Sequence, residues 1–447
     1  MNQQQSETGR RIFSGYYNAI RPPEDVELTH TGHGTPCGEY LRRFWQPVAL
    51  VSQVTDVPLK IRIMGEDLIL FRDRSKRLGL LHAHCAHRGT SLEFGIPLER
   101  GLRCCYHGWA WDIDGTCLET PGEPPHSRLR ESVFQGAYPV RDYCGLVFAY
   151  MGPPDQEPDF PRYDSLEFPA DNEHHAYSLA FPCNWLQSHE NGADPVHASF
   201  LHTISSGVQF TPAFGELAVC QYVETPLGLV ASATRRIGDN LWIRGSDVIA
   251  PNSAQFGSSF VHGHDIHYAV CSWVTRWVVP VDDHNNITIG IRLFNSLIDP
   301  ERRGNPDEIG LYKVDFAGQT PARPYHERQR EPGDFEAQVG QGGVARHAAE
   351  NLATTDKGVL MTRRFLRVGI RAVQEGKPFK RPTLNRHGVC PTYNHQIVHR
   401  YPRRNDRDDA EVLARFGQRV AEMIVAKDDL HPVERQAAVE REIRAEF

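Results

Sequence analysis

The segment from Cys85 to Trp109 reads CAHRGTSLEFGIPLERGLRCCYHGW and carries the strongest chemical pattern in the chain. Each end supplies one cysteine and one histidine: Cys85 and His87 first, then, after sixteen intervening residues, Cys104 and His107. Short runs typical of β-strands lie within and around the segment, each bounded by Gly, Asp or Pro. They are residues 61–71, which are typical of a strand, a Gly-centred turn and a second strand, and residues 78–82, 102–105, 109–113 and 145–151. Short strands at close spacing, with turn residues between them, predict a small antiparallel β domain over residues 45–155.

The mixed Cys and His pairs favour an iron–sulfur centre over a zinc site. Structural zinc sites usually group Cys with Cys and His with His. A Rieske [2Fe–2S] centre instead binds one iron through two Cys and the other through two His. The residues Cys85, His87, Cys104 and His107 supply that set, with zinc or a chance pairing as the alternatives. We interpret Cys105 as a small buried residue that has no bond to iron.

A second group of possible metal ligands, Asp194, His197 and His202, begins about 90 residues further on. Two His and one carboxylate on one face of an iron leave positions open for O₂ and a substrate. Asp194 would neighbour His197 on a helix, because the two are three residues apart. His197 and His202 are five apart and do not share a face of a regular helix, so we expect a broken helix or a bulge near His202. A helix with two structural histidines is the alternative.

The order C-A-H-R-G…L-R-C-C-Y-H-G-W, then D-x-x-H-x-x-x-x-H, resembles the oxygenase (alpha) subunits of Rieske non-haem iron aromatic ring-hydroxylating oxygenases. Within them it is similar to the group of phthalate dioxygenase and dehydrodivanillate O-demethylase, over residues 34–372. The resemblance implies that His197 and His202 bind a mononuclear Fe(II). It implies Asp334 as the third ligand, with Glu336 as the fallback and a solvated acidic pair as the structural alternative. Gly333 stands where relatives often have Gln or Glu.

The resemblance also implies an activity and its partners. The enzyme would use O₂, and electrons from a separate NAD(P)H-dependent reductase with or without a ferredoxin. It would hydroxylate or O-demethylate an aromatic compound, such as an aromatic carboxylate or a lignin-derived aryl ether. Three subunits would form a ring in which Asp194 bridges a cluster His of one subunit and an iron His of the next. The alternatives are a Rieske electron carrier fused to a binding domain, without oxygenase activity, and a zinc-stapled structural protein.

The expected fold class is α+β, because strand runs and helices do not alternate regularly. We expect an N-terminal segment at 1–44, a Rieske domain at 45–155, and a catalytic domain at 156–447 with an antiparallel sheet flanked by helices. Residues 152–161 are rich in Pro and acidic residues and are interpreted as a linker. Helices are expected at 359–373 and 410–426, and the apolar stripe of the second predicts core or subunit packing.

Composition and charge exclude several classes of protein. The 447 residues are 40% hydrophobic and 23% charged, with a net charge of −7, so we expect no binding of nucleic acid or of an anionic membrane. The longest apolar run, residues 146–151, is far shorter than the ~20 residues that span a bilayer. The polar start at residues 1–11 has no apolar signal region, which predicts a cytoplasmic location. Arg244 and Arg276 lie in strand-like runs; we expect them to be solvated or salt-bridged, with a substrate carboxylate as the alternative partner.

Overall fold

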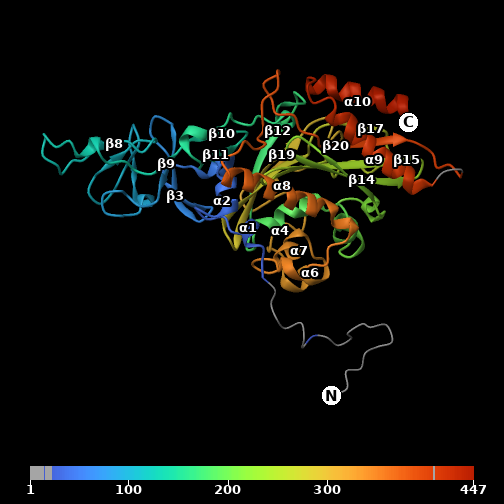
Figure 1. Cartoon of the computed structure of the whole chain (residues 1–447), viewed down its shortest axis with the longest axis horizontal. Helices are drawn as coiled ribbons and strands as arrows, with labels where there is room; N and C mark the ends of the chain where they lie inside the picture. Colours follow the sequence, from blue (N-terminus) through green and yellow to red (C-terminus); the bar gives the residue numbers. More distant parts are fainter. Residues whose placement is uncertain (1–14, 16–22, 406–407) are drawn as a thin grey trace, which may run out of the picture.

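Two β regions follow one another along the chain (Figure 1). The computed structural model describes residue 15, residues 23–405 and residues 408–447, so the polar start at residues 1–11 lies outside the described residues. The first region, blue to cyan, lies at one end of the molecule, and the second region carries the long strands and most of the helices (Figure 1). Every pair of named strands in the described residues is antiparallel, which confirms the predicted α+β class.

The first region contains three small sheets. They are β1(Trp45–Leu50)-β11(Leu146–Tyr150)-β10(Val140–Tyr143), then β2(Leu59–Ile63)-β3(Glu66–Arg72)-β4(Leu78–His82)-β9(Ala137–Tyr138), and β5(Ile96–Pro97)-β6(Leu102–Arg103)-β7(Ala110–Trp111)-β8(Cys117–Glu119). The predicted strand–turn–strand at 61–71 is the β2–β3 hairpin. Its turn residues, Met64 and Gly65, have φ of 47° and 79°, and two positive φ values match the right-handed twist of paired strands.

The second region is built on one nine-stranded sheet. Its main order is β12(Glu173–Phe181)-β19(Asn285–Phe294)-β18(Val274–Asp282)-β16(Ser253–Phe256)-β15(Asn240–Ile249)-β14(Gly228–Ile237)-β13(Val219–Glu224). Strand β20 (His395–Arg400) pairs with β15 and with β17 (His267–Ala269). Several strands are buried along most of their length, as in β14 and β18, because helices and loops cover the sheet.

The helices cover the sheet and join distant parts of the chain. They are α1 (Val26–Thr29), α2 (Pro36–Leu41), α3 (Asp164–Glu167), α4 (Trp185–Glu190), α5 (His197–Ser199), a π-helix (Phe200–Ile204), α6 (Tyr325–Arg330), α7 (Asp334–Val339), α8 (Lys357–Gln374), α9 (Asp409–Val425) and α10 (Pro432–Glu446). Leu413, Phe416 and Val420 of α9 are buried in one cluster with Val230 of β14, so the predicted stripe is core packing. At the N-terminal end, Asp25 and Glu27 form ion pairs with Arg367 of α8.

The segment predicted as a linker is packed against the first region. Phe160 is 7% exposed and contacts Trp45 and Phe148 edge-to-face, with ring centroids 5.5 and 5.1 Å apart. Phe148 of β11 in turn contacts Trp277 of β18 at 5.3 Å. One hydrophobic core therefore runs from the first region into the second and fixes β11 against the large sheet.

Candidate metal centres

Two loops of similar backbone hold the four predicted cluster ligands. In the first, the Gly89 N–H donates to the Cys85 carbonyl at 2.8 Å; in the second, the Gly108 N–H donates to the Cys104 carbonyl at 3.1 Å. Gly89 and Gly108 have φ of 76° and 75°, a left-handed conformation that glycine adopts without steric cost. The sequence thus builds two matching turns, each beginning at a cysteine.

The side chains of these loops fit a [2Fe–2S] cluster. Cys85 and Cys104 are each 3% exposed, whereas the rings of His87 and His107 lie closer to the surface with centroids 4.6 Å apart. Burial, and then the adjacent Cys104 thiol, raise the pKa of Cys85, which favours the protonated thiol in the absence of a metal. A bound metal would instead hold these side chains as thiolates. A buried thiol pair beside an outer imidazole pair is the donor arrangement that a Rieske centre needs.

Aromatic residues enclose the inner side of this site. The Trp109 ring stacks on His87, with centroids 4.3 Å apart and planes 2° apart. The Trp111 indole N–H donates to the Cys85 sulfur at 3.4 Å, and hydrogen bonds to the sulfurs are one determinant of a cluster's potential. The prediction that Cys105 is buried is wrong: this cysteine is exposed, unlike its neighbour Cys104.

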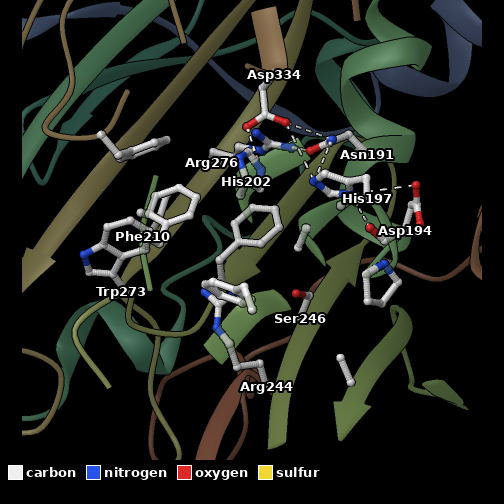
Figure 2. A pocket seen from close by; sticks show the side chains of 18 of the residues that line it. Asn191, Asp194, His197, His202, Phe210, Arg244, Ser246, Trp273, Arg276 and Asp334 are labelled. Carbon is white, nitrogen blue, oxygen red and sulfur yellow. Dashed lines mark hydrogen bonds and ion pairs between the residues drawn. The ribbon is translucent and has the colours of Figure 1, made fainter. Parts of the chain in front are cut away.

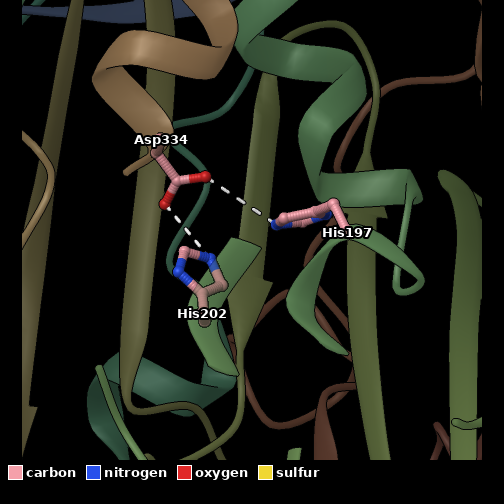
Figure 3. Close-up of side chains that lie close together, drawn as sticks. All are labelled: His197, His202 and Asp334. Carbon is pink, nitrogen blue, oxygen red and sulfur yellow. Dashed lines mark ion pairs between the residues drawn. The ribbon is translucent and has the colours of Figure 1, made fainter. Parts of the chain in front are cut away.

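His197, His202 and Asp334 come together into one group (Figure 3). One possible ligand atom from each lies within 4.8 Å of the others. His197 belongs to α5, and His202 lies in the π-helix that follows directly. The wider π-turn re-aims His202 toward His197 despite their five-residue spacing, as the bulge hypothesis required. Three donors on one side, two imidazoles and a carboxylate, match the donor set of a non-haem iron site with open positions.

Asp334, the first residue of α7, is a buried carboxylate with two amide donors. The Gln319 amide donates to its Oδ2 at 2.6 Å and the Asn191 amide donates to its Oδ1 at 3.1 Å. Burial raises the pKa of Asp334, but His202, His197, the Gln319 donor and Arg276 together lower it below its usual value. The side chain is therefore buried and hydrogen-bonded, not solvated as in the structural alternative.

Each histidine uses its Nδ1 for a fixed partner and turns its Nε2 toward Asp334; His197 Nε2 also lies 3.2 Å from the Asn191 amide nitrogen. His202 Nδ1 lies 2.8 Å from Gln209 Oε1, and His197 Nδ1 bonds the backbone carbonyl of Asp194. The Nε2 atoms of His197 and His202 lie 3.7 and 3.5 Å from the two Asp334 oxygens. Partners of this kind set the tautomer and orientation of metal-binding histidines.

Asp194 lies just before α5, not on it as the three-residue spacing predicted. Its Oδ1 accepts the Val196 N–H at 3.0 Å, and its Oδ2 lies 3.7 Å from His197 Nδ1. Its side chain is 32% exposed, so the carboxylate stands at the outer side of His197. Glu336, the fallback ligand, points elsewhere: it accepts the Gly333 N–H at 2.8 Å and pairs with Arg323 and Arg328.

A cavity opens directly beside this group (Figure 2). Aromatic side chains form much of its wall, starting with Phe210, whose ring lies 4.9 Å from that of His202. The other aromatic lining residues are Tyr177, Phe214, Phe256, Trp273 and Phe316. Arg244 and Ser246 lie at the opposite end from Asp334 (Figure 2).

Both arginines singled out in the sequence line this cavity, and the expectation that they are solvated or salt-bridged is wrong. Arg276 is 8% exposed and donates to the Ser188 carbonyl and to Asn191 Oδ1. Arg244 donates to the Gly257 carbonyl at 2.5 Å. In the part of the chain that the structure describes, neither has an acidic side chain within ion-pairing distance. Burial, and then nearby Arg235, lower the pKa of Arg244 to about 9.

Sequence reasoning missed four side chains that complete the site. Asn191, Gln209, Gln319 and Arg235 carry no motif of their own. Arg235 lines the cavity together with Arg244. It donates to Oγ of Ser199, a residue that lies between His197 and His202 in the sequence. A Gln or Asn gives no signal in one sequence, since its role depends on what the fold brings next to it.

Known proteins match the chain over nearly its whole length. Residues 44–139 match the family model of the Rieske [2Fe-2S] domain. The chain is 42% identical over 437 residues to the tert-butanol monooxygenase / tert-amyl alcohol desaturase oxygenase subunit of Aquincola tertiaricarbonis, covering 94% of this chain and 93% of that one. The chain belongs to the Rieske non-haem iron oxygenases.

This Rieske oxygenase is also 40% identical over 374 residues to the phenoxybenzoate dioxygenase subunit alpha of Ectopseudomonas oleovorans, over 80% of this chain and 88% of that one. Its fold matches the crystal structure of dicamba monooxygenase bound to dicamba, with a TM-score of 0.57, 18% identity, and coverage of 75% of this chain and 99% of that one. The chain is thus an oxygenase subunit, and its family carries a [2Fe–2S] cluster and a mononuclear iron. These relatives favour the oxygenase over a carrier without oxygenase activity. Within the described ranges, no helix is both long and apolar enough to cross a membrane.

Proposed function

We propose that Cys85, His87, Cys104 and His107 hold the [2Fe–2S] cluster within a domain at residues 45–155. We propose that His197, His202 and Asp334 hold the mononuclear iron within the domain at 156–447. The donor chemistry of each group supports these assignments. When bound, the cluster accepts single electrons, and the iron uses them to activate O₂ beside the substrate.

The substrate that the cavity supports best is an aromatic carboxylate, and Arg244 is the observation that carries this. The Arg244 side chain is half-buried, and its buried Nε has no hydrogen-bond partner among the described residues. A guanidinium that is largely removed from water, with no anion nearby, favours a ligand that brings one. An Arg–carboxylate pair is short, charge-assisted and bidentate. Arg235, whose pKa burial lowers to about 10, lies beside it and adds a second positive charge.

The cavity walls would orient such a substrate. Phe214 lies under both arginines, 4.7 Å from the Arg244 guanidinium and 5.1 Å from that of Arg235. Phe210 and Trp273 continue the wall toward His202. A carboxylate held by Arg244 therefore places the ring among aromatic side chains and its far edge toward the proposed iron ligands.

The relatives' names leave two kinds of substrate open. Phenoxybenzoate, named for one relative, is an aromatic carboxylate, whereas tert-butanol, named for the other, is a small neutral alcohol. The unpaired arginines favour the acid for this chain. An aryl ether is compatible with the same binding mode if it also carries a carboxylate at the Arg244 end.

We further propose that three chains close into a ring and that a separate NAD(P)H-dependent reductase, directly or through a ferredoxin, supplies electrons in the cytoplasm. Large apolar side chains are exposed on the first region, as Phe94, Tyr106 and Phe134, and beside the iron ligands, as Phe200 and Ile204. Exposed apolar residues of this kind mark interaction surfaces, and two different surfaces can pair head-to-tail in a closed ring.

Product analysis under ¹⁸O₂ tests the proposal. The purified protein, with iron, a surrogate reductase and NADH, is offered 4-methoxybenzoate, its uncharged amide 4-methoxybenzamide, and tert-butanol. We expect oxidation of the acid, with ¹⁸O in the products of ring or methyl hydroxylation, and at least ten times less of the amide. Turnover of tert-butanol without turnover of any aromatic acid in a wider panel would contradict the carboxylate proposal and leave the oxygenase assignment standing.

A further inference from the structure

The loop between β19 and α6 sends one buried side chain to the iron group. Gln319 is 4% exposed, and its amide donates to Asp334 Oδ2 at 2.6 Å. This oxygen is also the one that faces His202, whereas Asp334 Oδ1 faces His197 and accepts from Asn191. The two amides therefore hold the two carboxylate oxygens separately, and each oxygen is directed at a different histidine.

Two glycines bring the Gln319 loop close enough to do this. A Cβ on Gly333 would lie 2.3 Å from the Gly318 Cα, and a Cβ on Gly318 would lie 2.7 Å from the Gly333 Cα. The Phe335 N–H donates to the Gly318 carbonyl at 2.9 Å. The loop thus lies backbone to backbone on the start of α7. This explains why residue 333 has no side chain here: a Gln or Glu at that position would meet backbone atoms.

The same loop is held at a second point by a buried ion pair. Asp315 accepts two hydrogen bonds from Arg292 of β19, at 3.0 and 3.1 Å, and both side chains are almost fully buried. Gln319 is therefore fixed between this anchor and the contact with α7. A donor on a rigid loop orients its acceptor, whereas a donor on a free loop would follow it.

We propose that Gln319 is a positioning residue for the mononuclear iron, and this rests on the proposed ligand set. Its amide fixes the rotation of the Asp334 carboxylate, so that an oxygen is presented to the metal in one orientation. Partners of metal ligands act in this way in other sites, and their loss weakens metal binding by about 10–100-fold. Gln209, which bonds His202 Nδ1 and the Pro332 carbonyl, ties a second ligand to the same segment.

Metal titration of a Gln319→Met variant tests this role. Met keeps the length and volume of the side chain and removes the donor. The mononuclear site is emptied with a chelator, the Rieske absorption is checked, and Co(II) is titrated while its visible bands are recorded. We expect about 10–100-fold weaker Co(II) binding than in wild type, with an unchanged Rieske spectrum. Broader Co(II) bands would follow from a carboxylate that samples more than one orientation.

Gln187→Met is the matched control. Gln187 is also buried, but it donates to the carbonyls of Gln338 and Gly342 at the other end of α7, without touching Asp334. We expect this variant to lower the melting temperature and leave Co(II) affinity within about threefold of wild type. Equal weakening in both variants would overturn the proposal, because loosening of α7 would then explain the effect.

Two further outcomes keep the test decisive. If Gln319→Met does not fold, Gln319→Asn withdraws the same amide by one methylene and is expected to weaken Co(II) binding in the same direction. If the folded Gln319 variant binds Co(II) within threefold of wild type, the positioning role of Gln319 is overturned, while the proposed ligand set still stands. If Asp334→Asn also binds Co(II) as wild type does, the proposed ligand set itself fails, and that outcome is separate from the first.

Discussion

The two proposed metal centres are encoded in different ways. The four proposed cluster ligands lie between residues 85 and 107, on two turns that each close within a few residues. The proposed iron ligands come from α5, the π-helix and the start of α7, with more than 130 residues between His202 and Asp334. The proposed cluster centre is encoded by a local sequence motif, whereas the proposed iron centre forms only when the fold brings distant segments together.

Their surroundings differ in the same way. The cluster histidines face outward and meet mainly aromatic neighbours from the same short segment, such as Trp109. The proposed iron ligands are held by polar side chains: Asn191 and Gln319 donate to Asp334 from other segments, and Gln209 bonds His202 from seven residues further along the chain. We therefore expect substitutions at the first centre to act locally and completely, and substitutions around the second to act in graded steps and from a distance.

The largest expected effect tests how local the cluster centre is. Cys104→Ser should abolish the visible Rieske spectrum, because Cys85 and Cys104 supply both protein bonds to one iron. The neighbouring Cys105→Ser should keep the full spectrum, since Cys105 is exposed, whereas the proposed ligands Cys85 and Cys104 are buried. Absorption and EPR of the purified variants measure this. Loss of the cluster in Cys105→Ser with retention in Cys104→Ser would reverse the assignment.

Asp334→Ala should remove the mononuclear iron and leave the Rieske cluster in place. Two imidazoles alone bind Fe(II) weakly, so the iron content should fall from about three to about two per chain while the Rieske signal stays. Turnover should be lost with it. Glu336→Ala is the control, because Glu336 caps α7 and pairs with arginines. If Glu336→Ala loses one iron and Asp334→Ala loses none, the third ligand is Glu336 and not Asp334.

More of the cluster centre than of the iron centre could therefore be predicted from the sequence. The proposed cluster ligands, the hairpins around them and the pair of histidines could be proposed from spacing and residue chemistry. The bulge at His202 could be expected because a regular helix cannot place residues 197 and 202 together. The surroundings of Arg244 and Arg276 were misjudged, because a place in a cavity wall without an acidic partner is a property of the fold and not of a strand pattern. Asp334 depended on resemblance, and Gln319 could not be found, since both act across segments that only the fold joins.

Asp194 tests whether the two centres are linked between subunits. In the proposed ring its carboxylate would bridge His197 and a cluster histidine of the next chain. In the single chain, its Oδ1 accepts the Val196 N–H and its Oδ2 remains partly exposed. Asp194→Asn keeps an oxygen that can accept the Val196 N–H and removes the charge, so it separates the bridge from this local hydrogen bond, whose loss alone would cost about 1–3 kcal/mol.

We expect reduced Asp194→Asn, mixed with O₂ and substrate, to oxidise its cluster at least 100-fold more slowly than wild type, with both metals bound. Stopped-flow absorption of the cluster measures the rate. The matched control is Asp155→Asn, an exposed acid on the segment between the two regions, which should oxidise at the wild-type rate. Near-normal cluster oxidation in Asp194→Asn would leave this residue with only its hydrogen bond from the Val196 N–H.

The smallest effect concerns the far end of the cavity. Arg244→Met should raise KM for an aromatic carboxylate by about 10–100-fold, because a charged hydrogen bond contributes about 1.5–3 kcal/mol. The value of kcat should change much less, since Arg244 lies at the opposite end of the cavity from Asp334 (Figure 2). The uncharged amide of the same acid is the internal control. If Arg244 binds the carboxylate, the variant should lose its preference for the acid over the amide while KM for the amide stays near wild type. If KM rises equally for acid and amide, Arg244 only shapes the wall over Phe214, and the anion would have to be held by Arg235 or lie outside the cavity.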